Sequence, residues 1–87
     1  MHVDLFSSAF CAPCRSTRRV LAQAQRLVPA ARVTETDVAD APERAAAEGI
    51  TSTPTVVVRD DEGREVFRAA GVPTLPQVLT ALAATLP

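Results

Sequence analysis

The chain has 87 residues, a hydrophobic share of 47% and a formal net charge of −1. This length suffices for one compact domain with a small core of its own, so we expect a single domain over residues 1–87. The near-neutral charge argues against a nucleic acid or an acidic membrane as a partner. No internal repeat and no low-complexity tract interrupts the sequence.

We expect neither a membrane anchor nor a targeting signal from this sequence. No stretch approaches the roughly 18 apolar residues of a membrane span. The first ten residues, MHVDLFSSAF, lack a basic region followed by an apolar run, so no signal peptide is expected. We therefore expect a cytoplasmic protein, a setting in which disulfides are seldom structural. A mature secreted fragment is the alternative.

The first two predicted elements are a short strand and a long helix. Residues 2–6 (HVDLF) alternate, with Val3 and Leu5 on one side of the strand. From Cys11 onward the hydrophobic period becomes helical, and Pro29 ends the helix. The predicted apolar stripe of this helix comprises Thr17, Val20, Leu21, Ala24, Leu27 and Val28, and the opposite polar side comprises Arg15, Arg18, Arg19, Gln23 and Arg26.

Five further elements follow. A second strand is expected over residues 31–38 and a short helix over residues 40–49. Residues 54–60 (PTVVVRD) are too apolar for an edge strand, and a DDEG turn joins them to a last strand over residues 64–70. An amphipathic helix over residues 74–86 ends the chain, and its predicted apolar face comprises Leu75, Val78, Leu79, Leu82 and Leu86.

The predicted order of the elements is β-α-β-α-β-β-α, which indicates an α/β fold. A long helix joins the first two strands, so these should be parallel through a right-handed crossover. The final two strands form a hairpin and add antiparallel pairs. We expect a four-stranded mixed sheet with helices on both faces, in one layered domain.

All three predicted helices begin with a similar pattern. They open with Cys11-Ala-Pro-Cys14, Asp40-Ala-Pro-Glu43 and Thr74-Leu-Pro-Gln77. The second and third patterns predict capping boxes, with proline in the first turn, and Gly49 is expected at the C-terminal cap of the second helix. By position, Cys11 is the N-cap of the first helix. Its sulfur should therefore lie where free backbone N–H groups and the positive end of the helix dipole converge.

The two cysteines allow three interpretations. A structural zinc site needs four ligands, and the chain offers only these two thiols and His2, so metal binding is disfavoured and none is expected. A structural staple is also disfavoured, because linking residues three apart removes little entropy from the unfolded chain. One helical turn brings the two Cα atoms close enough for a disulfide that can form and break readily. The spacing therefore favours a reversible redox pair.

The redox interpretation assigns a different role to each thiol. A thiolate at a helix N-terminus is stabilised, so Cys11 is expected to be the attacking nucleophile. Cys14 lies one turn further in and is placed to resolve a mixed disulfide. Arg15 could add positive potential near Cys11, but a solvated helix face shared with Arg18 and Arg19 is the favoured interpretation of that residue. A C-x-x-C pair that opens a helix directly after a strand is a strong redox signal.

With these residues in place, the chain resembles the thioredoxin family. The resemblance rests on FCAPC, on GITSTPTVVVRDDEG and on Gly71, in that order, and it covers nearly the whole chain. It implies the thioredoxin fold in a trimmed form, with Pro54 as a cis-proline facing the active site. The backbone of Thr53 would then be free to pair with an extended substrate segment. An ordinary trans proline that starts a strand is the alternative.

The sequence also departs from the family pattern. Thioredoxins usually have an extra strand and helix before the active-site strand, so the trimmed core is similar to that of small glutaredoxin-like thioredoxins. Phe10 stands where thioredoxins have a tryptophan, and Leu5 stands where they have a buried aspartate. Asp4 should face the other way. The family's usual proton acceptor for Cys14 is therefore missing from this position, and AGVPTLPQ in place of a glutathione motif makes glutathione dependence unexpected.

The resemblance implies a protein-disulfide reductase with no cofactor beyond its own Cys11–Cys14 disulfide. Expected partners are disulfide-containing substrate proteins and a thioredoxin-reductase-like flavoprotein drawing on NADPH, and the expected state is a monomer. The expected substrate-binding surface comprises Phe10, Ala12, Pro13, Thr53, Gly71 and Val72. One alternative is a redox-sensing or adaptor domain without general turnover. A dimer that bridges an iron–sulfur cluster through Cys11 is a more remote one.

Overall fold

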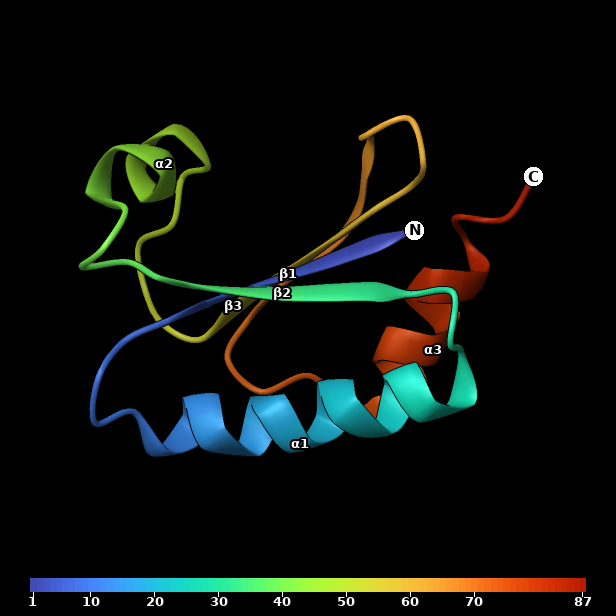
Figure 1. The fold of residues 1–87 in the computed structure, drawn as a ribbon, viewed down its shortest axis with the longest axis horizontal. Coiled ribbons are helices and arrows are strands. Elements are labelled where there is room, and N and C mark those ends of the chain that lie inside the picture. The colour runs from blue at the N-terminus through green and yellow to red at the C-terminus, as the bar shows by residue number, and fades with distance from the viewer.

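The computed structural model describes all residues, 1–87, and has the predicted order of elements (Figure 1). The strands and helices are β1 (His2–Ser7), α1 (Ala12–Leu27), β2 (Arg32–Asp37), α2 (Pro42–Ala47), β3 (Thr55–Arg59), β4 (Glu65–Ala70) and α3 (Leu75–Ala83). The four strands form one mixed sheet in the order β2-β1-β3-β4. β1 and β2 are parallel, and the other two pairs are antiparallel, as expected.

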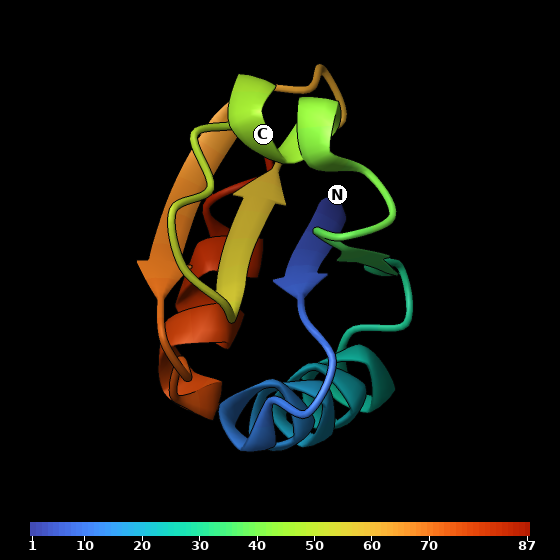
Figure 2. The same cartoon turned by 90° about the vertical axis from the view of Figure 1, so that its left-hand side faces the viewer.

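Helices lie on both sides of the sheet (Figures 1 and 2). α1 and α3 together cover one face, and α2 lies over one end of the other. The guanidinium of Arg44 in α2 lies 5.5 Å from the centre of the Phe6 ring, a cation–π contact with β1. Because α2 has only six residues, it leaves much of this second face uncovered. No helix is both long and apolar enough to span a membrane.

The core lies between the sheet and the α1–α3 layer. Its buried apolar side chains come from β1, α1, β3 and α3, with one from the loop before β2: Val3, Leu5, Leu21, Ala24, Ala31, Val56, Val58, Val78, Ala81 and Leu82. Val56, Val57 and Val58 are all fully buried, and β3 lies inside the sheet between β1 and β4. This position explains the continuous apolar run that argued against an edge strand.

Two predicted core residues are exposed instead. Leu27 has 61% and Leu86 has 62% of its surface exposed. Leu27 is the last residue of α1, beyond Ala24, the last α1 side chain buried against the core. Leu86 lies after the end of α3 at Ala83, so it no longer follows the helical face. Helical periodicity predicts the side on which a residue lies, but it does not predict where the neighbouring layer stops.

The predicted capping box at Asp40 is wrong. α2 begins one residue later, with Ala41 as its N-cap and no side-chain hydrogen bond at that position. Asp37 organises the preceding turn instead, since its Oδ1 accepts the N–H of Ala39 and its carbonyl accepts the N–H of Asp40. The other two helix starts are as expected: Cys11 caps α1, and Thr74 and Gln77 form a complete capping box on α3.

The expected glycine cap of α2 is present. Gly49 has a φ of +71°, in the left-handed region that glycine adopts without strain. Its N–H donates to Ala46, and the N–H of Ile50 donates to Ala45, which together form a Schellman motif. This turn directs the chain back across the end of the sheet toward residues 51–54 and the start of β3.

Candidate active site

The two cysteines lie at the N-terminus of α1 and are joined in a disulfide, with their Cα atoms 5.2 Å apart. Cys11 has an extended backbone (φ −104°, ψ 99°), and its Sγ accepts the N–H of Cys14 at 3.1 Å. The sulfur thus performs the capping role that oxygen performs at Thr74. A thiolate at this position would meet free N–H groups and the positive end of the helix dipole.

Exposure differs sharply between the two sulfur-bearing residues. Cys14 is fully buried, whereas Cys11 is partly exposed at the head of the helix. A disulfide or thiol from outside can therefore reach Cys11 but not Cys14. The division into a nucleophile and a resolving thiol needs such an asymmetry, and the division itself stays a prediction.

Two hydrogen bonds bring the three predicted site segments together. The Oγ of Ser8 lies 2.7 Å from the Oγ1 of Thr53, which joins the loop before Cys11 to the loop before β3. The N–H of Gly71 donates to the carbonyl of Pro54 at 2.8 Å. The Thr53–Pro54 peptide bond is cis. These bonds therefore join the loop before Cys11, the loop before β3 and Gly71, which are far apart in sequence.

The rim of the site is apolar and exposed. Phe10 has its whole side chain in solvent and a φ of +56°, a left-handed conformation that turns the chain from β1 into α1. Ala12 and Pro13 are exposed in the first turn of α1, and Val72 is 45% exposed beyond Gly71. Substrate binding by these side chains stays a prediction, as does the role of Pro54.

No carboxylate occupies the sheet position beneath α1 that Leu5 fills. Leu5 is buried in the core, and Asp4 faces the opposite side of the sheet, as the alternation of β1 predicts. There the Oδ1 of Asp4 accepts the hydroxyl of Thr34 at 2.5 Å and lies 3.1 Å from the Nε2 of His2. Asp4 therefore belongs to a separate polar network and not to the site at the cysteines.

Sequence reasoning missed a second network, on the α1 side of the sheet. Glu35 of β2 accepts a hydrogen bond from the hydroxyl of the buried Ser7 at 2.8 Å, and its two carboxylate oxygens accept from the Nε of Arg18 at 2.7 Å and 3.0 Å. The Nη2 of Arg18 also donates to the Oε2 of Glu35 at 2.7 Å, so the guanidinium and the carboxylate form a bidentate ion pair. The available signal was alternation, because Glu35 shares the α1-facing side of β2 with Val33.

The ion pair between Arg18 and Glu35 shifts the pKa of each of the two groups. The hydrogen bonds from Arg18, helped by that from Ser7 and opposed by partial burial, lower the pKa of Glu35. The hydrogen bond to Glu35 raises the pKa of the Arg18 guanidinium. Arg18 lies four residues after Cys14, so this network fastens α1 to β1 and β2 one turn beyond the resolving cysteine.

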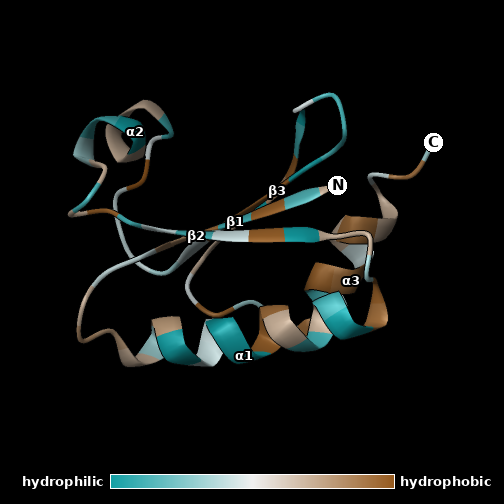
Figure 3. Cartoon of the chain, in the orientation of Figure 1, coloured by the Kyte–Doolittle hydropathy of each residue, from teal (hydrophilic) through white to brown (hydrophobic).

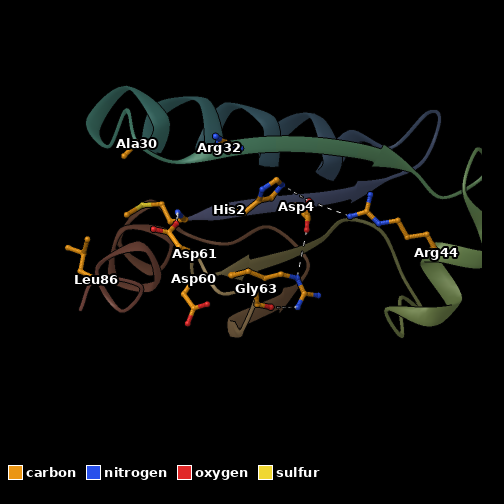
Figure 4. Close-up of a pocket in the computed structure, with 11 residues that line it drawn as sticks. His2, Asp4, Ala30, Arg32, Arg44, Asp60, Asp61, Gly63 and Leu86 are labelled. Atoms are coloured by element: carbon orange, nitrogen blue, oxygen red, sulfur yellow. Dashed lines mark hydrogen bonds and ion pairs between the residues drawn. The ribbon is translucent and has the colours of Figure 1, made fainter.

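A cavity lies away from the cysteines, on the face of the sheet that α2 leaves uncovered (Figure 4). It measures about 860 Å³, and Asp4 lies on its floor with Arg44 and Arg59 directed toward it. A smaller cavity of about 260 Å³ is lined by Val38 and residues 50–53, and it adjoins the candidate site through Thr53. No three His, Cys, Asp or Glu side chains are grouped as metal ligands would be.

Comparison with known proteins identifies structural relatives only. No protein-family model and no curated protein matches the sequence. Mitochondrial thioredoxin 3 from Saccharomyces cerevisiae is 26% identical with a TM-score of 0.79, over 98% of this chain and 77% of that one. Thioredoxin from Fasciola hepatica is 28% identical with a TM-score of 0.77, over 91% of this chain and 77% of that one.

A third solved structure extends the likeness at the level of the fold. Thioredoxin 1 from Thermosipho africanus has a TM-score of 0.82 at 20% identity, over 97% of this chain and 92% of that one. The shared architecture therefore covers nearly the whole chain, including the segment that bears the two cysteines.

Proposed function

We propose that this chain is a member of the thioredoxin family and that it reduces disulfides in partner proteins through Cys11 and Cys14, and its fold and its C-x-x-C pair support this. The observation that supports this most directly is the unequal burial of the pair. Cys11 is accessible and lies at the helix N-terminus, while Cys14 is fully buried one turn away. Such a pair suits attack by one thiol and release by the other.

The proposed reaction begins from the reduced dithiol. The Cys11 thiolate attacks one sulfur of a substrate disulfide, and the other substrate sulfur leaves as a thiolate that takes a proton from solvent. The Cys14 sulfur then attacks the Sγ of Cys11, and its proton passes to the substrate sulfur that leaves in this step. The S–S bond to the substrate breaks, the second substrate sulfur leaves as a thiol, and the Cys11–Cys14 disulfide forms. Two electrons have passed from the protein to the substrate.

The rim of the site offers a binding mode for the substrate. An extended segment could pair with the backbone of Thr53, a short β-augmentation beside Cys11. Apolar side chains of the segment would contact Phe10, Ala12, Pro13 and Val72, all of which are exposed. The Ser8–Thr53 and Pro54–Gly71 hydrogen bonds would hold the two sides of this surface in register.

Repeated turnover needs a source of two electrons for each cycle. We assign this role to a thioredoxin-reductase-like flavoprotein that draws on NADPH, with the protein acting as a monomer in the cytoplasm. The Cys11–Cys14 pair itself holds the electrons between the two half-reactions, so the proposal requires no bound cofactor.

Insulin reduction with dithiothreitol as electron source tests the proposed activity. The wild-type protein should accelerate precipitation of the insulin B chain, and Cys11→Ser should abolish the acceleration. Cys14→Ser should instead accumulate a mixed disulfide through Cys11, visible by non-reducing electrophoresis and mass spectrometry. Undiminished reduction by Cys11→Ser would contradict the proposal.

A redox-sensing adaptor is the second candidate, and the full exposure of Phe10 beside the disulfide favours it. An exposed aromatic side chain next to a switchable bond suits tight binding to one partner. The two candidates differ in turnover. Catalytic reduction of several unrelated disulfides supports the reductase, whereas redox-dependent binding of one partner without turnover supports the adaptor.

A further inference from the structure

α1 has an unusual distribution of charge. Its 16 residues contain four arginines and no acidic residue, although the whole chain has a net charge of −1. The helix thus contributes +4, and the rest of the chain is at −5. Hydrophilic residues recur along the helix in Figure 3. A helix whose outer surface served only to keep the protein in solution would usually mix both signs in pairs one turn apart.

Three of these arginines form one line. At about 100° per residue, Arg15, Arg19 and Arg26 fall within about 40° of one another around the helix axis. All three are exposed. We name these three side chains the arginine edge. It begins one turn after Cys11 and extends away from it along α1, for roughly 22 Å between Cys11 and Arg26.

The arginine edge has no counter-charge within the protein. The ion pairs of arginine side chains involve Arg18 with Glu35, Arg44 with Asp4, Arg59 with Asp4 and Glu48, Arg64 with Glu62 and Arg68 with Glu65. Most arginines outside α1 are therefore neutralised locally. On α1, only Arg18 has an ion-pair partner, and the three side chains of the arginine edge make no ion pair.

Helix stability does not explain this arrangement. Positive charge in the first turns of a helix interacts unfavourably with its dipole, and Arg15 and Arg19 form a like-charged pair four residues apart. The edge is, however, adjacent to the nucleophile and leads directly to it. Uncompensated charge beside a reactive group raises the rate at which oppositely charged partners arrive in a productive orientation.

We propose that the arginine edge is a docking surface for partner proteins that have acidic side chains beside their disulfide. The inference rests on the proposed reductase function and specifies its partners. Apolar contacts around Phe10 would accept the segment next to the target cysteine, while the acidic side chains would lie along α1. Substrates with basic residues in those positions would be disfavoured by the same charges.

Three model peptides test this surface. Each contains a disulfide-closed Cys-Gly-Gly-Cys ring flanked on both sides by about eight residues, which span roughly 26 Å when extended and so reach Arg26. The flanks are rich in glutamate, in lysine or in glutamine alone. The measured quantity is the second-order rate constant for oxidation of the reduced protein, by acid quench and chromatography.

We expect the wild-type protein to react at least about tenfold faster with the glutamate peptide than with the lysine peptide at about 20 mM salt. At about 500 mM salt the two rates should approach each other within about twofold, because the screening length falls to a few ångströms. Equal rates with all three peptides at low salt would remove the docking inference and leave the reductase function intact. Failure to react with any of them would contradict the function itself.

Variants separate docking from an effect on Cys11. Arg26→Glu changes the charge roughly 22 Å from Cys11, about one screening length at the salt concentration of the assay, so any effect on the Cys11 sulfur itself would change the rates with all three peptides alike. It should nevertheless lower the preference for the glutamate peptide at least about threefold at low salt, and Arg26→Gln should lower it less. Arg64→Glu makes the same change of charge far from α1 and serves as the control. Arg64 is exposed in the turn between β3 and β4, and Asp61 of that turn pairs with the amino group of Met1, at the end of β1 opposite to Cys11. A preference unchanged by Arg26→Glu, or lowered equally by Arg64→Glu, would overturn the assignment of the arginine edge.

Discussion

The hydroxyl of Ser8 lies 2.7 Å from the hydroxyl of Thr53, although 45 residues separate them in the sequence. This bond connects the loop that leads into Cys11 with the loop that ends at Pro54. Both hydroxyls are partly buried, so the bond is shielded from competition by bulk water. The two halves of the candidate site are thus fastened directly to each other on the approach to the cysteines.

Removal of that bond should weaken the reductase. Ser8→Ala deletes one partner and leaves Thr53 free to rotate, so the substrate-pairing backbone is less well positioned. We expect kcat/KM in the insulin assay to fall about threefold to tenfold, which corresponds to the roughly 0.5–1.5 kcal/mol of one hydrogen bond. Ser16→Ala, at an exposed position of α1, is the control. Equal effects of the two substitutions would argue against a positioning role for Ser8.

Acid should weaken the attachment of α1 to the sheet. The pKa of Glu35 is lowered, chiefly by its hydrogen bonds with Arg18, so the carboxylate stabilises the folded state above the pKa it has in the unfolded chain, about 4.3. That stabilisation disappears as the pH falls through the lowered pKa. Glu35→Gln should therefore lower Tm at pH 7, by no more than about 4 °C because the pair is partly exposed.

Thermal unfolding followed by circular dichroism from pH 7 to pH 2 measures this effect. The Tm curves of the wild type and Glu35→Gln should converge at the acid end of the range. Glu62→Gln, which alters an exposed carboxylate 3.9 Å from Arg64, should change Tm less at pH 7. A gap between the wild type and Glu35→Gln that persists at pH 2 would be inconsistent with a charge-based contribution.

Asp4 should contribute to stability and not to catalysis. Its carboxylate is buried and accepts the hydroxyl of Thr34, with His2 and Arg44 close by on the face of the sheet remote from α1. Asp4→Ala leaves these polar groups without their shared acceptor, and we expect a loss of about 1–3 kcal/mol in the free energy of unfolding. Urea denaturation measures the loss. The insulin assay at a temperature where the variant is folded should show unchanged kcat/KM.

The two helix starts that share a D/T-x-P-E/Q pattern should respond differently to substitution. Thr74→Ala removes a complete capping box and should cost about 1 kcal/mol in the free energy of unfolding. Asp40→Ala should cost less than about 0.5 kcal/mol, because Asp40 makes no capping bond and α2 begins at Ala41. Urea denaturation of both variants compares the two sites. Similar losses would show that Asp40 caps α2 in solution.

Patterns along the chain were sufficient to predict the features that depend on sequence neighbours. The order of strands and helices followed from periodicity, and the roles of Cys11, Thr74 and Gly49 followed from local cap chemistry. The internal position of β3 followed from its uninterrupted apolar run. These predictions succeeded because the partner atoms lie within a few residues of one another, where the backbone geometry of the element dictates the distance.

Features that depend on strand register and on the extent of each layer became visible in the folded domain alone. The exposure of Leu27 and Leu86 depends on where the packed layers end. The bond between Ser8 and Thr53 depends on how two loops approach each other, and the Ser7–Glu35–Arg18 network depends on the pairing of β1 with β2 and the position of α1 above them. Such contacts join residues from different elements, and their distances follow from the packing of the whole domain, which no local pattern contains.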